Sequence, residues 1–134
     1  AGALYPLELD LAVAEGLYQY RPADHVLLVR GKEDLRPALY TAALRQDAVL
    51  HAPGVFLVTA VYARTAGKYG EVRAPRYVYL EAGHATQNML LQAVALGLAG
   101  VPIGAFYDEQ VQEALGVPED HAPLYLVPIG PPAA

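Results

Sequence analysis

The sequence predicts a single α+β domain spanning residues 1–134. Residues 7–11 alternate apolar and polar side chains, which is typical of a half-buried strand. Residues 55–62 form a nearly continuous apolar and β-branched run, which is typical of a strand buried on both faces. A long run of small and apolar residues from Pro75 to Leu96 predicts one helix. Strand pairs mixed with helices, rather than strict βαβ alternation, favour the α+β class.

The N-terminal part is expected to form a loop and then paired strands. Residues 1–6 end at Pro6 and are expected to form the loop. Turn residues at Glu15–Gly16 and Arg21–Asp24 separate the apolar runs. A β-hairpin is expected across the second turn, between residues 17–20 and 25–30. The strands are expected over residues 7–13, 17–20 and 25–30.

A helix is expected next, over residues 32–45. Leu35, Leu39 and Ala42 recur there at helical spacing, and Pro37 falls in the first turns, where proline is tolerated. The buried run at residues 55–62 follows and is the best candidate for the centre of the sheet.

A polar segment punctuated by glycines, residues 64–73, precedes the long helix, which is expected to stop at Gly97. Residues 101–105 are then expected to form a tight turn. Proline fixes φ there, and two residues with almost no side chain let the backbone approach a flat ligand. The last elements expected are a helix over residues 109–115 capped by Asp108 and a strand over residues 124–127.

Composition excludes several classes of function. The net charge of −5 argues against nucleic acid or an anionic membrane surface as a partner. The sequence contains no cysteine and no serine, which excludes disulfides, thiolate catalysis and a Ser-His-Asp triad. The four histidines are far apart, so no metal motif is expected. Without a membrane-spanning run or a secretory signal, the expected location is the cytoplasm.

Two groups of residues could carry chemistry. Lys68 and Tyr69 lie between Gly67 and Gly70, where an adaptable backbone could present them at a cavity. A lysine with a lowered pKa can act as a base and a tyrosine can relay a proton, although an ordinary surface pair is the simpler interpretation. The other group is a polar stripe on the long helix, which is either a solvated face or a seam at an interface or ligand cavity. It comprises Tyr77, Glu81, His84, Asn88 and Gln92.

Five passages together resemble the nitroreductase-like flavoproteins, most closely the SagB-type azoline dehydrogenases of thiazole- and oxazole-forming peptide pathways. Each passage alone is weak evidence, but the five follow one another in the expected order. They are A-G-A-L-Y-P-L-E-L (1–9), T-A-x-K-Y-G (65–70), R-Y-x-x-L-E-A-G-H-x-x-Q-N-x-L-L-x-A-x-x-L-G-L (76–98), V-P-I-G-A-F (101–106) and A-P-L-Y-L-x-P-I-G (122–130).

The resemblance implies a nitroreductase-like fold, in which a mostly antiparallel central sheet packs on a long core helix. It also implies FMN at the interface of a homodimer. A turn matching Pro102, Ile103, Gly104 and Ala105 would border the flavin near N5. A loop matching Ala1, Gly2 and Ala3 would reach the flavin from the partner subunit.

The resemblance further implies that Lys68 and Tyr69 are the proton-handling pair of an azoline dehydrogenase. Aromatising an azoline in a peptide or small-molecule substrate removes a hydride and a proton from adjacent atoms. Flavin N5 would accept the hydride, and Lys68 or Tyr69 would take the proton. Backbone N–H groups of residues 102–105 would stabilise the charge of the reduced flavin.

The sequence departs from the family pattern at its N-terminus, because the Arg-containing segment that grips the FMN phosphate has no counterpart. We therefore expect the C-terminal portion of the family fold, with a separate chain possible as the source of the N-terminal half. Losing charge-assisted phosphate contacts could cost several kcal/mol of cofactor affinity. Two alternatives stay open: a general NAD(P)H-dependent nitro- or flavin reductase, and a cofactor-free dimeric interaction subunit or remnant of a flavoenzyme.

Overall fold

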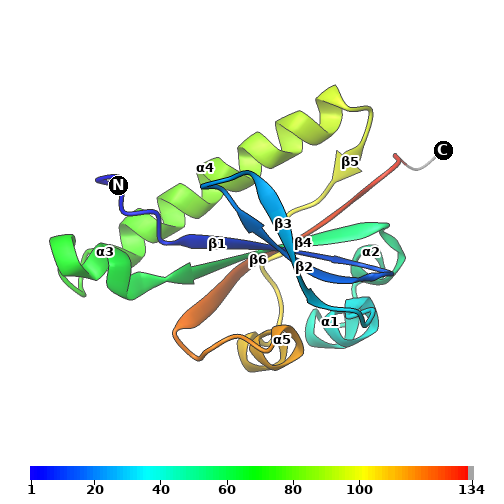
Figure 1. Cartoon of the computed structure of the whole chain (residues 1–134), viewed down its shortest axis with the longest axis horizontal. Coiled ribbons are helices and arrows are strands. Elements are labelled where there is room, and N and C mark those ends of the chain that lie inside the picture. The colour runs from blue at the N-terminus through cyan, green and yellow to red at the C-terminus, as the bar shows by residue number, and fades with distance from the viewer. Residues whose placement is uncertain (133–134) are drawn as a thin grey trace.

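The computed structural model describes residues 1–132 and contains one six-stranded sheet (Figure 1). The strands run in the order β3-β2-β1-β4-β6-β5, and each neighbouring pair is antiparallel. They are β1 (Leu7–Val13), β2 (Gly16–Arg21), β3 (Val26–Gly31), β4 (Gly54–Val61), β5 (Ala99–Gly100) and β6 (His121–Gly130). The α+β class and the mostly antiparallel sheet are confirmed.

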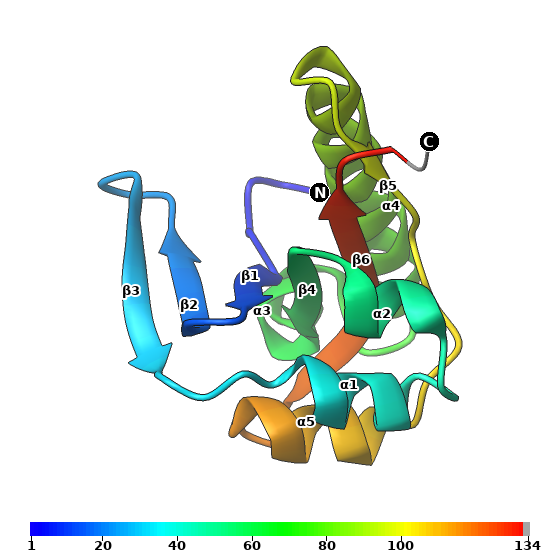
Figure 2. The same ribbon diagram turned by 90° about the vertical axis from the view of Figure 1, so that its right-hand side faces the viewer.

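Helices cover the two faces of the sheet unequally (Figures 1 and 2). The short helices α1, α2 and α5 lie together on one side, and the long helix α4 lies on the other. The helices are α1 (Arg36–Ala42), α2 (Asp47–His51), α3 (Tyr62–Tyr69), α4 (Ala74–Ala95) and α5 (Asp108–Leu115). Among residues 1–132, no helix combines the length and the apolar character that crossing a membrane requires.

The central strand β4 divides the core into two clusters. Val55 and Leu57 point toward α1, α2 and α5, where they pack in the larger cluster with Leu39 and Leu126. Phe56 points the other way and packs in the smaller cluster beneath α4. Because both faces of β4 are covered, the expectation of a doubly buried central strand is confirmed.

Several element boundaries match the sequence expectations. The first strand has the expected bounds, and β2 and β3 form the expected hairpin. The long helix ends where expected, since Gly97 has a φ of +74° and the Leu98 N–H donates to the Ala93 carbonyl at 2.8 Å. Gly116 ends α5 in the left-handed conformation.

Two helix expectations were wrong in detail. The helix expected over residues 32–45 is two helices, because Leu44 and Arg45 turn the chain with φ values of +57° and +60°. Pro37 falls in the first turn of α1, so the helix begins only there. Residues 64–69, expected as a polar segment, belong to α3, which ends at Gly70 with a φ of +78°.

The expected tight turn at residues 101–105 was also wrong. The segment is extended and runs beside β6, with Ile103 paired to Leu126. The apolar Ile103 side chain is 5% exposed, and its burial holds the segment against the sheet. Asp108 lies in the first turn of α5 rather than capping it, because Tyr107 occupies the cap position.

Gly16 provides a test of the hairpin. Its φ is +145°, and a Cβ placed there would lie 2.2 Å from the Gly31 carbonyl oxygen, which is backbone and cannot move aside. We expect Gly16→Ala to lower the free energy of unfolding by more than about 2 kcal/mol in urea titrations. The control is Gly67→Ala in α3, where a Cβ meets nothing within 4 Å. Because alanine favours the helix more than glycine does, this variant should raise the free energy of unfolding by ~0.5–1 kcal/mol. Equal stability of the two variants would contradict the geometry.

Asp10 provides a test of stability against pH. The side chain is 1% exposed, and burial raises its pKa above 3.8, although Arg30 at 3.4 Å opposes the shift. The folded protein therefore holds this proton more tightly than the unfolded chain. The resulting stabilisation is complete below pH 3.8 and is lost as pH rises through the folded-state pKa.

We expect the stability of Asp10→Asn, measured relative to the parent protein, to increase as pH rises from 3.8. Chemical unfolding at a series of pH values gives this difference directly. Asp24→Asn is the control, because the hydrogen bond from Arg21 lowers the pKa of Asp24. The stability of this variant relative to the parent protein should therefore decrease as pH rises. A difference for Asp10→Asn that falls with pH would refute the assignment.

Candidate functional site

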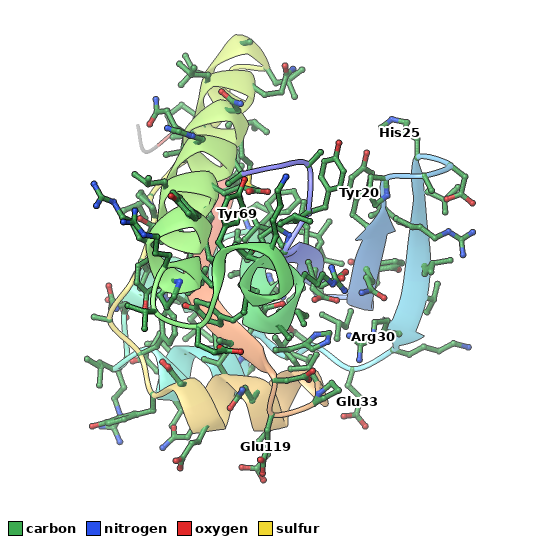
Figure 3. The ribbon with its side chains drawn as sticks, turned by 90° about the vertical axis from the view of Figure 1, so that its left-hand side faces the viewer. Tyr20, His25, Arg30, Glu33, Tyr69 and Glu119 are labelled. Atoms are coloured by element: carbon green, nitrogen blue, oxygen red, sulfur yellow. The ribbon has the colours of Figure 1, made fainter. Side chains whose placement is uncertain are left out.

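The N-terminal loop lies against the Lys68–Tyr69 pair. A Cβ placed on Gly2 would lie 2.8 Å from the Tyr69 hydroxyl and 3.1 Å from Lys68 Nζ. Figure 3 shows Tyr69 on the side of the molecule where the N-terminal segment runs. Ala3 and Tyr5 in this loop have positive φ values of 54° and 49°, which are uncommon for residues with a side chain. The structure thus brings the predicted loop Ala1–Ala3 next to the predicted pair Lys68–Tyr69.

The end of α3 and the start of α4 position Tyr69. Lys68 and Tyr69 are the last two residues of α3, and Gly70 turns the chain into α4. The Tyr69 ring meets the Tyr77 ring with centroids 4.7 Å apart and an interplanar angle of 61°. Lys68 Nζ lies 5.5 Å from the centroid of the Tyr69 ring. Tyr69 therefore has an aromatic contact with Tyr77, and its hydroxyl lies close to Gly2.

A cavity of about 400 Å³ opens between the N-terminal loop and α4. The Ala1 nitrogen donates to Glu81 Oε2 at 2.8 Å across this region. Three of the five polar stripe residues border the cavity, which favours the interpretation of that part of the stripe as a ligand-facing seam. The lining residues are Ala1, Ala3, Tyr5, Tyr77, Leu80, Glu81 and His84.

A second cavity, of about 390 Å³, borders Gly104. A Cβ placed on Gly104 meets no atom within 4 Å, so the backbone faces open space there. Ile103 anchors the segment in the core, and the Gln46 side chain donates to the Ala105 carbonyl at 3.1 Å. The lining residues are Tyr79, Ala82, Gly104, Phe106, Asp108, Pro123, Leu124 and Tyr125.

The two cavities have no lining residue in common. Both border α4, but Tyr79 and Ala82 face one cavity whereas Tyr77, Glu81 and His84 face the other. Ala1–Ala3 and Lys68–Tyr69 therefore lie together, and the Pro102–Ala105 segment lies elsewhere. Within residues 1–132, neither of these two cavities is lined by all the predicted residues.

Sequence reasoning missed Tyr62, Tyr79 and Asp108. The rings of Tyr62 and Tyr79 meet edge to face, with centroids 6.1 Å apart and an interplanar angle of 83°. Burial raises the pKa of the Tyr62 phenol well above its usual range, and hydrogen bonding with Tyr79 and the charge of Asp108 add to the effect. For the two tyrosines the sequence signal is the excess of tyrosine, ten in 134 residues, and Asp108 was predicted only as a helix cap. Among residues 1–132, no group of three acidic or histidine side chains could hold a metal ion.

The fold and the cavities define the class: an α+β protein in which bare backbone and tyrosine side chains line an open cavity. A family model described as "Nitroreductase family" matches residues 1–131. The chain belongs to the nitroreductase family.

Known proteins agree with this assignment. The chain is 42% identical over 136 residues to MJ1384 of Methanocaldococcus jannaschii, which is named as a nitroreductase, covering 97% of this chain and 67% of that protein. A crystal structure from Anabaena variabilis, also named as a nitroreductase, superposes with a TM-score of 0.88 at 33% identity. It covers 96% of this chain and 27% of that chain.

The fold also resembles a chain of the Escherichia coli microcin synthetase McbBCD complex, solved with truncated pro-MccB17 bound. The TM-score is 0.87 at 21% identity, covering 99% of this chain and 54% of that chain. At this identity the likeness concerns the fold alone.

Proposed function

We propose that the chain is the ring-binding part of an FMN-dependent oxidoreductase, with the flavin against Pro102–Ala105. Members of the nitroreductase family generally bind flavin. The observation that carries the proposal is the bare backbone of Gly104 beside a cavity of about 390 Å³. An added Cβ would meet no protein atom there, so packing does not explain the glycine. A flat ring that needs close approach to the backbone does explain it.

The division of the predicted residues between two cavities favours a homodimer. A second copy could bring Lys68 and Tyr69 of one protomer to the Gly104 cavity of the other. The exposed face of α4 supports such an interface, because Leu80, Leu91 and Val94 are each more than half exposed. Spacings of 11 and 14 residues return to nearly the same side of a helix, so these side chains form one apolar stripe. Such stripes mark protein contacts.

The reaction we propose is the oxidation of an azoline ring carried by a peptide or small molecule. When bound, FMN supplies the hydride acceptor for this oxidation. Lys68 or Tyr69 takes the proton from the adjacent atom of the substrate ring. The ring contact between Tyr69 and Tyr77, and the closeness of Gly2 to both Lys68 and Tyr69, support this role. Tyr77, Glu81 and His84 border the adjoining cavity, where the rest of the substrate would lie.

A general NAD(P)H-dependent nitro- or flavin reductase is the second candidate. The identity of 42% to a protein named as a nitroreductase favours it. In that reaction the Lys68–Tyr69 pair has no required role, since an added nicotinamide donor delivers the hydride. The two candidates share the Gly104 cavity and differ in their dependence on Lys68.

Gly104→Ala tests flavin binding. We expect this variant to bind FMN at least about tenfold more weakly, because an added methyl group overpacks a ring that lies against the backbone. Its free energy of unfolding should change by less than ~0.5 kcal/mol, since the methyl group meets no protein atom. FMN fluorescence titration and urea unfolding measure the two quantities. Gly67→Ala, which also adds a methyl group in open space, is the control and should bind FMN normally. Unchanged FMN affinity in Gly104→Ala would count against the proposed ring position.

Lys68→Ala separates the two reactions. We expect azoline oxidation to fall by roughly 10²-fold or more, the usual contribution of a positioned general base. Nitroaromatic reduction with NAD(P)H should stay within about threefold of the parent protein, because it does not use this proton acceptor. Single-turnover assays on protein with matched FMN content give both rates. Equal losses in the two assays would favour a structural role for Lys68 and would exclude its role as the proton acceptor in azoline oxidation alone.

A further inference from the structure

Two side chains give the Gly104 cavity polar groups that the proposed reaction does not use. Tyr79 extends from the second turn of α4, and Asp108 from the first turn of α5. Phe106, Pro123 and Leu124 make much of the remaining wall apolar. In a largely apolar cavity, a few polar groups fix the orientation of the bound molecule. Tyr79 and Asp108 are thus placed to decide which edge of a ring enters.

The neighbouring Tyr62 determines what Tyr79 can offer. Tyr62 is the first residue of α3, directly after the central strand, and its ring packs edge to face on Tyr79. Burial raises the pKa of the Tyr62 phenol, and hydrogen bonding with Tyr79 adds to the shift, so this phenol keeps its proton and is available as a donor toward Tyr79. A phenol carries one proton, so a Tyr79 oxygen that accepts from Tyr62 keeps its own O–H for a group in the cavity.

The polar groups of the cavity complement one edge of a flavin. The phenol of Tyr79 can donate a hydrogen bond, and the carboxylate of Asp108 can accept one. The pyrimidine edge of an isoalloxazine ring alternates carbonyl oxygens with an N–H group, so it needs a donor and an acceptor side by side. The benzenoid end of the same ring carries only methyl groups and would leave both side chains unpaired.

Resting on the proposed function, we infer that Tyr79 donates a hydrogen bond to the pyrimidine edge of the flavin ring and that Asp108 accepts one from it. Tyr62 is a positioning residue, which holds the Tyr79 phenol with its proton toward the ring. The specificity is for the ring and not for the phosphate, because no Lys or Arg lines this cavity.

The experiment titrates riboflavin and FMN separately into the full chain and records flavin fluorescence and the visible absorption band. We expect Tyr79→Phe to bind both flavins about threefold to tenfold more weakly, the loss of one hydrogen bond, and to shift the band. Asp108→Ala, which removes the acceptor, should weaken the binding of both flavins to a similar degree. Tyr62→Phe keeps the ring contact and should move the band in the same direction, with a smaller loss of affinity.

Tyr107→Phe is the matched control, because Tyr107 is 56% exposed and does not line the cavity. Tyr79 is 58% exposed, so its Phe variant should keep the fold, which the unfolding midpoint checks. Affinity and band position equal to the control would overturn the inference, as would an effect on FMN without one on riboflavin. If the parent protein binds neither flavin, the proposed function fails as well. If the parent protein binds flavin and Tyr79→Phe binds it equally, the inference alone fails.

Discussion

The backbone pairing between Ile103 and Leu126 fixes the position of Gly104 at the edge of its cavity. The Ile103 N–H donates to the Leu126 carbonyl at 2.8 Å, and the Leu126 N–H donates back at 3.0 Å. Both side chains are buried in the same core cluster, so the pairing is held by burial as well as by hydrogen bonds. Since side chains alternate along an extended segment, fixing Ile103 inward turns Gly104 outward. The outward direction of Gly104 is thus a consequence of core packing, whereas its lack of a side chain is not.

Helix α4 both completes the fold and divides the site. The face it turns to the sheet carries the buried Ala74, Val78, Ala82, Thr86 and Ala93. These side chains are small, so the helix can lie close to the sheet along its length. Residues on its flanks then border different cavities, Tyr79 on one side and Tyr77 on the other. Any reaction that needs both sets of residues must bring them together by another route, and a second protomer is the simplest.

Local patterns in the sequence predicted the fold well and the site only in part. Alternation revealed β1, and a continuous apolar run revealed β4. Successive side chains of a strand point to opposite faces of the sheet, so burial of one face or of both leaves a pattern in the sequence. The extended state of residues 101–103 could not be predicted locally, since it depends on pairing with residues more than twenty positions away. The contact between Tyr62 and Tyr79 depends on the turn from β4 through α3 into α4, and no spacing rule covers it. The closeness of Gly2 to Tyr69 also depends on the path of the chain, because it requires a loop whose residues have positive φ values.

The distribution of charge constrains how a phosphorylated cofactor could be held. All nine Lys and Arg residues lie at or before Arg76, and residues 77–134 contain only acidic charges. The Gly104 cavity follows this bias, with Asp108 as its charged lining residue. A phosphate bound beside that cavity would find no cationic side chain on β6 or α5 to neutralise it. Positive charge would have to come from residues 21–76, which hold all nine Lys and Arg side chains, from another subunit, or from another chain. If the proposed flavin binds at the Gly104 face, this part of the chain would contact the ring, and the phosphate would be held elsewhere.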